Sequence, residues 1–233
     1  MSRGLRTQDL PKWIKKGIDS AFREWLNMSG EWLNTAPEYF VTVHIAQQLK
    51  RNVDTNQRTI FMEPSVNKTL EEAGGIQPGP NAKKLRSTGR YDLVIGHQDL
   101  RPRAVIEVKS PMWNSLEKSM RADLNRLCRT LLQNQDGTQI QSALMAMYVA
   151  SRTPKAKDET AKSRLKRKWV EQMPKDLQEC EWAEGSRAKY LNNLNFKTHI
   201  HLHDHRAGDE LYAWGSVCIE ITRKTPAQKK KMA

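Results

Sequence analysis

Residues 89–111, GRYDLVIGHQDLRPRAVIEVKSP, decide the fold of this chain. Two apolar runs flank a polar turn, and this pattern predicts two short paired strands. The first run carries one charged side chain, Asp92, and the second carries Glu107 and Lys109. Because side chains alternate along a strand, Glu107 and Lys109 share one face, while their apolar neighbours occupy the other. We therefore expect the polar side chains of both strands to meet in one cleft.

Asp92 and Glu107 together form a candidate site for a divalent cation. A carboxylate within an apolar strand needs a partner, because burying an unpaired charge is costly. Mg²⁺ prefers oxygen ligands and keeps several waters, so two carboxylates and a backbone carbonyl, that of Val108, make a natural set. A bound ion would polarise a phosphate and lower the pKa of a bound water. Lys109 would orient or help to deprotonate that water, or stabilise charge in the transition state.

The rest of the chain predicts an α/β fold. Residues 7–27 have an apolar side chain every four residues, which indicates a helix that Asp9 would cap. Thr35 and Pro37 suit the start of a second helix, and Glu38 then lies near its positive end. The expected order continues with a strand at 58–62, a surface loop at 71–86, the motif strands, a helix at 116–132 and a doubly covered strand at 143–150. We expect a mixed central β-sheet flanked by helices.

The chain is strongly basic. Its 39 Lys and Arg residues outnumber 26 Asp and Glu residues, giving a formal charge of +13, and such a field attracts polyanions, most often nucleic acid. A basic helix with a narrow apolar seam is expected within residues 151–175, and a closing strand pair at 197–205 and 211–221. The side chains that we expect to bind nucleic acid are Lys83, Lys84, Arg86, Lys162, Arg164, Lys166, Arg167 and Lys168.

The cysteines and the apolar stretches of the chain indicate its cellular compartment. The three cysteines are scattered and show no CxxC spacing, which argues against a disulfide scaffold and fits a reducing cytosol. The first residues contain no apolar run typical of a signal peptide, and no stretch is apolar enough for a membrane span. We expect a cytoplasmic protein with no membrane partner.

Asp92, fourteen intervening residues, and then Glu107, Val108 and Lys109 resemble the motif of the PD-(D/E)xK nuclease superfamily. Residues 37–150 follow the order of elements in that family, although Tyr91 stands in place of its nominal proline. The resemblance implies a restriction-endonuclease-like core and a Mg²⁺-dependent DNA endonuclease, with Mn²⁺ able to substitute. It also implies that Glu38 holds a second ion or the attacking water. On this reading residues 1–36 are a helical extension, 37–150 the catalytic core, and 151–233 the basic helix and closing strands of the same domain.

Several alternatives stay open. The same fold could bind DNA without cutting it, or Glu107 and Lys109 could form a surface salt bridge on an edge strand. A third reading uses His199, His201, His203 and His205, which alternate along one strand and would share one face suited to zinc or another transition metal. Successive positions on that face lie about 6.5–7 Å apart, so a metal there needs ligands from elsewhere.

A homodimer, or protein partners in a larger DNA-processing system, would suit an enzyme that cuts both strands.

Overall fold

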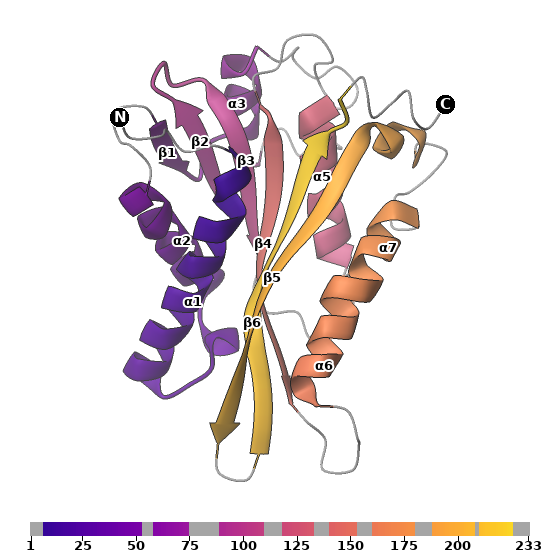
Figure 1. The fold of residues 1–233 in the computed structure, drawn as a ribbon. Helices are drawn as coiled ribbons and strands as arrows, with labels where there is room; N and C mark the ends of the chain where they lie inside the picture. The colour runs from indigo at the N-terminus through magenta and orange to yellow at the C-terminus, as the bar shows by residue number, and fades with distance from the viewer. Residues whose placement is uncertain are drawn as a thin grey trace.

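The computed structural model describes residues 7–52, 58–74, 89–109, 118–132, 140–152, 160–179, 188–207 and 210–225. In these ranges a six-stranded sheet is flanked by helices (Figure 1). The strands are β1 (Arg58–Met62), β2 (Leu93–His97), β3 (Pro102–Lys109), β4 (Ser142–Arg152), β5 (Leu194–Ala207) and β6 (Glu210–Arg223). The α-helices are α1 (Leu10–Ser29), α2 (Glu38–Asn52), α3 (Val66–Glu72), α5 (Lys118–Leu132), α6 (Ala161–Lys166) and α7 (Met173–Glu179). A π-helical segment, Arg167–Gln172, joins α6 to α7, and short 3-10 helices cover Thr7–Asp9, Leu33–Thr35 and Ala188–Asn193.

The sheet is mixed, with the strand order β1-β2-β3-β4-β6-β5. β3 and β4 run parallel, and each other neighbouring pair is antiparallel. A parallel pair needs a crossover connection, and α5 lies between β3 and β4 in the chain. The predicted α/β class and mixed sheet are therefore confirmed. Because β3 lies inside the sheet, the alternative of an edge-strand salt bridge at Glu107 and Lys109 is wrong.

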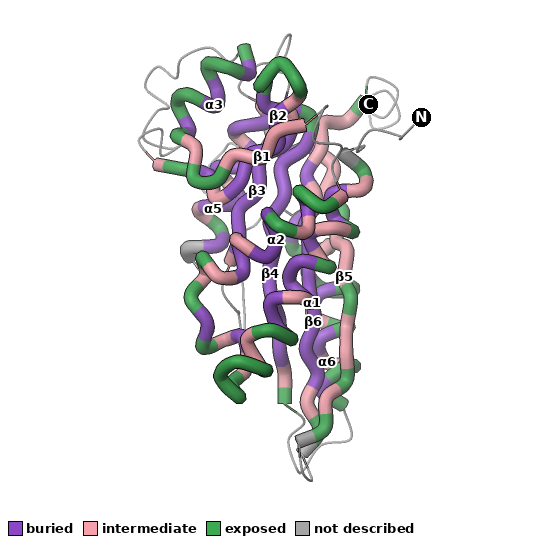
Figure 2. The backbone as a smooth tube through the Cα atoms, turned by 90° about the vertical axis from the view of Figure 1, so that its left-hand side faces the viewer, coloured by how far each residue is buried: buried purple, intermediate pink, exposed green. Residues whose placement is uncertain are grey.

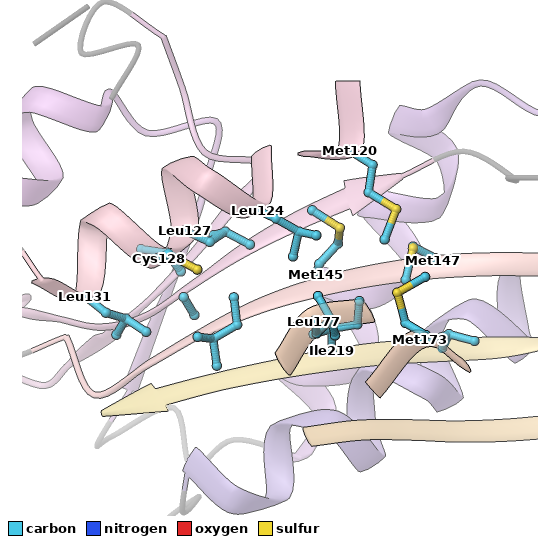
Figure 3. Packing of buried hydrophobic residues seen from close by; sticks show 14 of the residues in the cluster. Met120, Leu124, Leu127, Cys128, Leu131, Met145, Met147, Met173, Leu177 and Ile219 are labelled. Atoms are coloured by element: carbon cyan, nitrogen blue, oxygen red, sulfur yellow. The ribbon is translucent and has the colours of Figure 1, made fainter. Parts of the chain in front are cut away.

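Two apolar cores cover the two faces of the sheet. α1 and α2 lie on one face, and α5, α6 and α7 lie on the other (Figure 1). β4 and β6 are buried along most of their length, whereas the edge strand β5 is partly exposed (Figure 2). On the α5 face, Met120, Leu124 and Leu127 pack against Met145 and Met147 of β4 (Figure 3). The strand predicted to be covered on both faces is confirmed as β4.

α1 rests closely on α2 and ends at a glycine. A Cβ atom on Gly17 would lie 2.6 Å from the Ile45 Cα, so the helices can approach this closely only because residue 17 has no side chain. Gly30 ends α1 in the left-handed conformation, with φ of 72°, and donates its N–H to the Leu26 carbonyl. This is the usual glycine signal for the end of a helix.

Local details differ from the sequence-based expectations. The side chain of Asp9 makes no capping hydrogen bond to α1. The Thr35 hydroxyl donates a hydrogen bond to the Trp32 carbonyl and accepts one from the Trp25 indole N–H, and it does not cap α2. The segment expected to be a loop from residue 71 begins inside α3, and its remainder from residue 75 lies outside the described residues. β4 continues to Arg152, so the boundary predicted after residue 150 falls within a strand. Within the described ranges, no helix is long and apolar enough to cross a membrane.

Candidate active site

The pairing of β2 with β3 brings the motif residues together. Leu93 pairs with Ile106, so Asp92, one residue before β2, comes beside the end of β3. Asp92 thus precedes the first motif strand instead of lying within it, as the sequence had suggested. Its Oδ2 accepts a hydrogen bond from the Val108 N–H at 2.6 Å. The structure thus brings the backbone N–H of Val108 to Asp92. That the Val108 carbonyl is a metal ligand stays a prediction.

Glu107 and Lys109 point toward α5, as the predicted alternation requires. The Glu107 side chain is 2% exposed, and its Oε2 lies 2.6 Å from an Arg126 guanidinium nitrogen. The Lys109 Nζ lies 2.9 Å from Asp123 Oδ2 and 3.9 Å from Glu38 Oε1. Glu107 and Lys109 therefore each have an oppositely charged partner from a helix. Glu38, the first residue of α2, is brought to the same place.

Two site residues, Asp123 and Arg126, were missed by the sequence analysis. They stand three positions apart on α5, and Arg126 lies 3.2 Å from Asp123 Oδ1 as well as contacting Glu107. The signal was present, since each immediately precedes a leucine of the apolar stripe and therefore lies at its edge. Arg126 is also held over the Tyr91 ring, 5.8 Å from its centroid.

Burial and neighbouring charges shift the pKa values of the motif residues. Burial raises the pKa of Glu107 to about 8, because the opposing effect of Arg126 is insufficient and Asp92 and Asp123 add to the shift. Burial also raises the pKa of Asp92, despite the hydrogen bond from Val108. For Lys109, burial lowers the pKa, but the hydrogen bond and charge of Asp123 outweigh it and raise the pKa overall. These carboxyl groups resist ionisation, whereas the lysine stays protonated.

The donor set suits a hard divalent cation. Carboxylate oxygens are the ligands that Mg²⁺ prefers, and Glu107 Oε1 is buried without a hydrogen-bond partner among the described residues. A nearby dication would favour ionisation of both Asp92 and Glu107, whose pKa values are otherwise raised by burial and by neighbouring carboxylates, Glu38 for Asp92 and Asp92 itself for Glu107. Glu107 is nevertheless bound to Arg126 and Asp92 to the Val108 N–H, and within the described ranges the two acids do not form a tight group with a third ligand. Among the described residues, three ligand-type side chains come within 4.8 Å of one another only at Asp19, His201 and His203.

Searches with the whole chain found no relative. No protein-family model matches it, and neither the curated proteins nor the solved structures contain a match.

The predicted nucleic-acid-binding residues are only partly described. Lys83, Lys84 and Arg86 lie outside the described residues. The later group lies on α6 and the following π-helical segment, whose buried Leu165 and Trp169 form the predicted apolar seam. Lys162 forms an ion pair with Asp204 at 2.6 Å, so its positive charge is partly neutralised. In the rest of the group, Lys166 and Arg167 are exposed and Arg164 is half-buried. The Lys168 ammonium lies over the Trp169 ring.

The four alternating histidines lie on β5 but have separate partners. His199 bonds to Glu220 at 2.8 Å, and His205 packs edge-on against Trp32. His201 and His203 instead meet Asp19 of α1. The shared strand is confirmed, while the four imidazoles are not one ligand set.

The raised pKa of Glu107 predicts that stability of the metal-free protein depends on pH. The folded chain keeps a proton on Glu107 up to about pH 8, whereas a carboxyl with the ordinary value of 4.5 releases it earlier on unfolding. The stabilisation is complete below the ordinary pKa and is lost as the pH rises through the folded value. In EDTA, we expect the Tm of the wild type to fall more from about pH 5.5 to pH 8 than that of Glu107→Gln. Equal pH profiles in thermal-unfolding measurements would contradict the shift.

Proposed function

We propose that this chain is a Mg²⁺-dependent endonuclease that hydrolyses phosphodiester bonds in DNA, built on a restriction-endonuclease-like core. The observation that carries the proposal is the meeting of buried Glu107 with Asp92 and Lys109 at the end of β3. The order of elements supports it. A helix bearing Glu38 precedes an antiparallel three-stranded unit, and α5 then leads to the parallel, fully covered β4.

Asp92 and Glu107 would hold the metal ion, with Glu38 placed to hold a second ion or the attacking water. When bound, Mg²⁺ supplies a Lewis acid that polarises the scissile phosphate and lowers the pKa of a bound water. Because its pKa is raised, Lys109 stays protonated and donates hydrogen bonds instead of acting as the base. It would orient the attacking water or stabilise negative charge on the phosphate. Arg126 fixes the Glu107 carboxylate from α5.

The charge of the chain supports DNA as the substrate. A net charge of +13 attracts a polyanion, and phosphate contacts commonly position a nucleic acid without reading its sequence. Lys166 at the end of α6 and Arg167 at the start of the π-helical segment are exposed, where they could make such contacts. Their contribution should fall as salt is raised, because each phosphate contact releases counterions.

A cleavage assay tests the proposal. Supercoiled plasmid, linear duplex, single-stranded DNA and RNA are incubated with protein purified in EDTA, then with added Mg²⁺, Mn²⁺ or Ca²⁺. We expect nicked or linear plasmid with Mg²⁺ and Mn²⁺ and no product in EDTA. Cleavage that is undiminished by EDTA, or no product from any substrate with either ion, would overturn the proposed function.

A second candidate is a DNA-binding protein of the same fold that does not cut. The observation in its favour is that Glu107 and Lys109 are both engaged by buried partners, Arg126 and Asp123, as in a structural ion network. Gel-shift measurements with and without Mg²⁺ distinguish the two. Equal affinity under both conditions, with no product, would favour the binding protein.

A further inference from the structure

A second group of ligand-type side chains lies on the face of the sheet that α1 covers. Asp19 belongs to α1, and His201 and His203 belong to the edge strand β5. Asp19 Oδ2 lies 2.8 Å from His201 Nδ1 and 3.4 Å from His203 Nε2. One ligand atom from each residue falls within 4.8 Å of the others. Such separations allow three side chains to bind a single ion.

Two polar atoms in this cluster lack hydrogen-bond partners in the described part of the chain. Asp19 is only 5% exposed, and its Oδ1 is buried without a hydrogen bond. His203 Nε2 is also buried, and the geometry of its contact with Asp19 is not that of a hydrogen bond. A buried polar atom without a partner is costly, so these atoms are more easily explained as metal ligands than as parts of a plain ion pair.

The surroundings orient the His203 imidazole. The His203 ring stacks on Trp214 with centroids 4.1 Å apart, and it lies 4.3 Å from the His201 ring. A Cβ atom on Gly215 would collide with the His201 carbonyl, so β5 can approach β6 this closely only beside a glycine. A metal ligand benefits from such support, because the ring is already oriented before the ion binds.

We propose that Asp19, His201 and His203 bind a transition-metal ion, with Zn²⁺ as the representative ion. Imidazole nitrogen and carboxylate oxygen are both zinc ligands, and three protein ligands leave the fourth tetrahedral position open. Asp19 and His201 line a cavity of about 860 Å³, from which a water or an anion could fill that position. The same cavity is lined by Lys12, Lys15, Lys16 and Arg23, which favour an anion.

The ion would join two distant parts of the chain. Asp19 and His201 are 182 residues apart in sequence, so a shared ion fastens α1 to the edge of the sheet. Because the ligands come together only in the folded state, binding stabilises that state. This site does not depend on the proposed nuclease activity, since its residues belong to α1 and β5, which carry none of the motif residues.

The test uses full-length protein without a histidine tag, freed of metal by dialysis against EDTA. Zn²⁺ binding is measured by calorimetry, Co²⁺ binding by visible absorption, and stability by thermal unfolding. We expect one equivalent of Zn²⁺ to bind and the Tm to rise by several degrees. Asp19→Asn and His203→Ala should each abolish both effects, while His199→Ala, on the same strand face but paired with Glu220, should retain them.

Thermal unfolding in EDTA shows whether each variant folds. If His203→Ala does not fold, the nearly isosteric Asp19→Asn decides the question. The proposal is overturned if the wild type shows no saturable binding of Zn²⁺ or Co²⁺. It is also overturned if folded Asp19→Asn binds as tightly as the wild type, or if His199→Ala loses binding equally.

Discussion

Replacing Asp92 by asparagine is expected to lower the rate of Mg²⁺-dependent DNA cleavage by at least about 10³-fold. The substitution keeps the shape of the side chain and can still accept the hydrogen bond from Val108. It removes one negative charge from the pair that Asp92 forms with Glu107, and an amide is a much weaker ligand for Mg²⁺. Initial rates of plasmid nicking at several Mg²⁺ concentrations measure the loss.

Asp99→Asn is the matched control. Asp99 belongs to the connection between the same two strands, but it is exposed and paired with Arg101. We expect its cleavage rate to stay within a few-fold of the wild type. Lys109→Met should show a loss as large as that of Asp92→Asn, with exposed Lys68→Met as its control. If Asp92→Asn and Lys109→Met both cut at the wild-type rate, the reaction takes place elsewhere.

Above about pH 8, where Glu107 is ionised, replacing Arg126 by methionine is expected to destabilise the fold by about 3–5 kcal/mol, because it removes one partner of a buried ion pair. Arg126 contacts Glu107 at 2.6 Å, and both side chains are almost fully buried. Without Arg126, the pKa of Glu107 should rise further, and the carboxylate should lose its fixed position. Cleavage should therefore fall as well. Chemical denaturation measures the stability, with exposed Arg121→Met on the same helix as the control.

A double variant separates the structural role of Arg126 from its role in positioning Glu107. Above about pH 8, combining Arg126→Met with Glu107→Gln removes both charges of this pair, so part of the lost stability should return, although Asp123 still lacks Arg126. Activity should stay absent, because the proposed metal ligand is gone. In Arg126→Met alone, higher pH should restore part of the cleavage, since more Glu107 ionises. A single variant as stable as the wild type would show that the ion pair contributes little.

The sequence predicted those parts of the site that depend on local pattern. Alternation in β3 correctly placed Glu107 and Lys109 on one face, and a continuous apolar run correctly predicted β4. Asp123 and Arg126 were missed because a helical stripe shows which face is buried without showing which polar edge meets which strand. Asp19 could not be paired with His201 from sequence, because no local periodicity relates residues so distant in the chain.

The packing of α1 against the sheet limits where the chain can be divided into smaller pieces. α1 places Leu10, Ile14, Ile18 and Phe22 in the core, and Phe22 stacks on Trp214 of β6 with centroids 3.8 Å apart. A fragment starting at residue 37 would expose the part of this face that α1 covers and would also lose Asp19. What the sequence presented as an N-terminal extension is thus an integral wall of the folded unit. The smallest autonomous piece of this protein must include it.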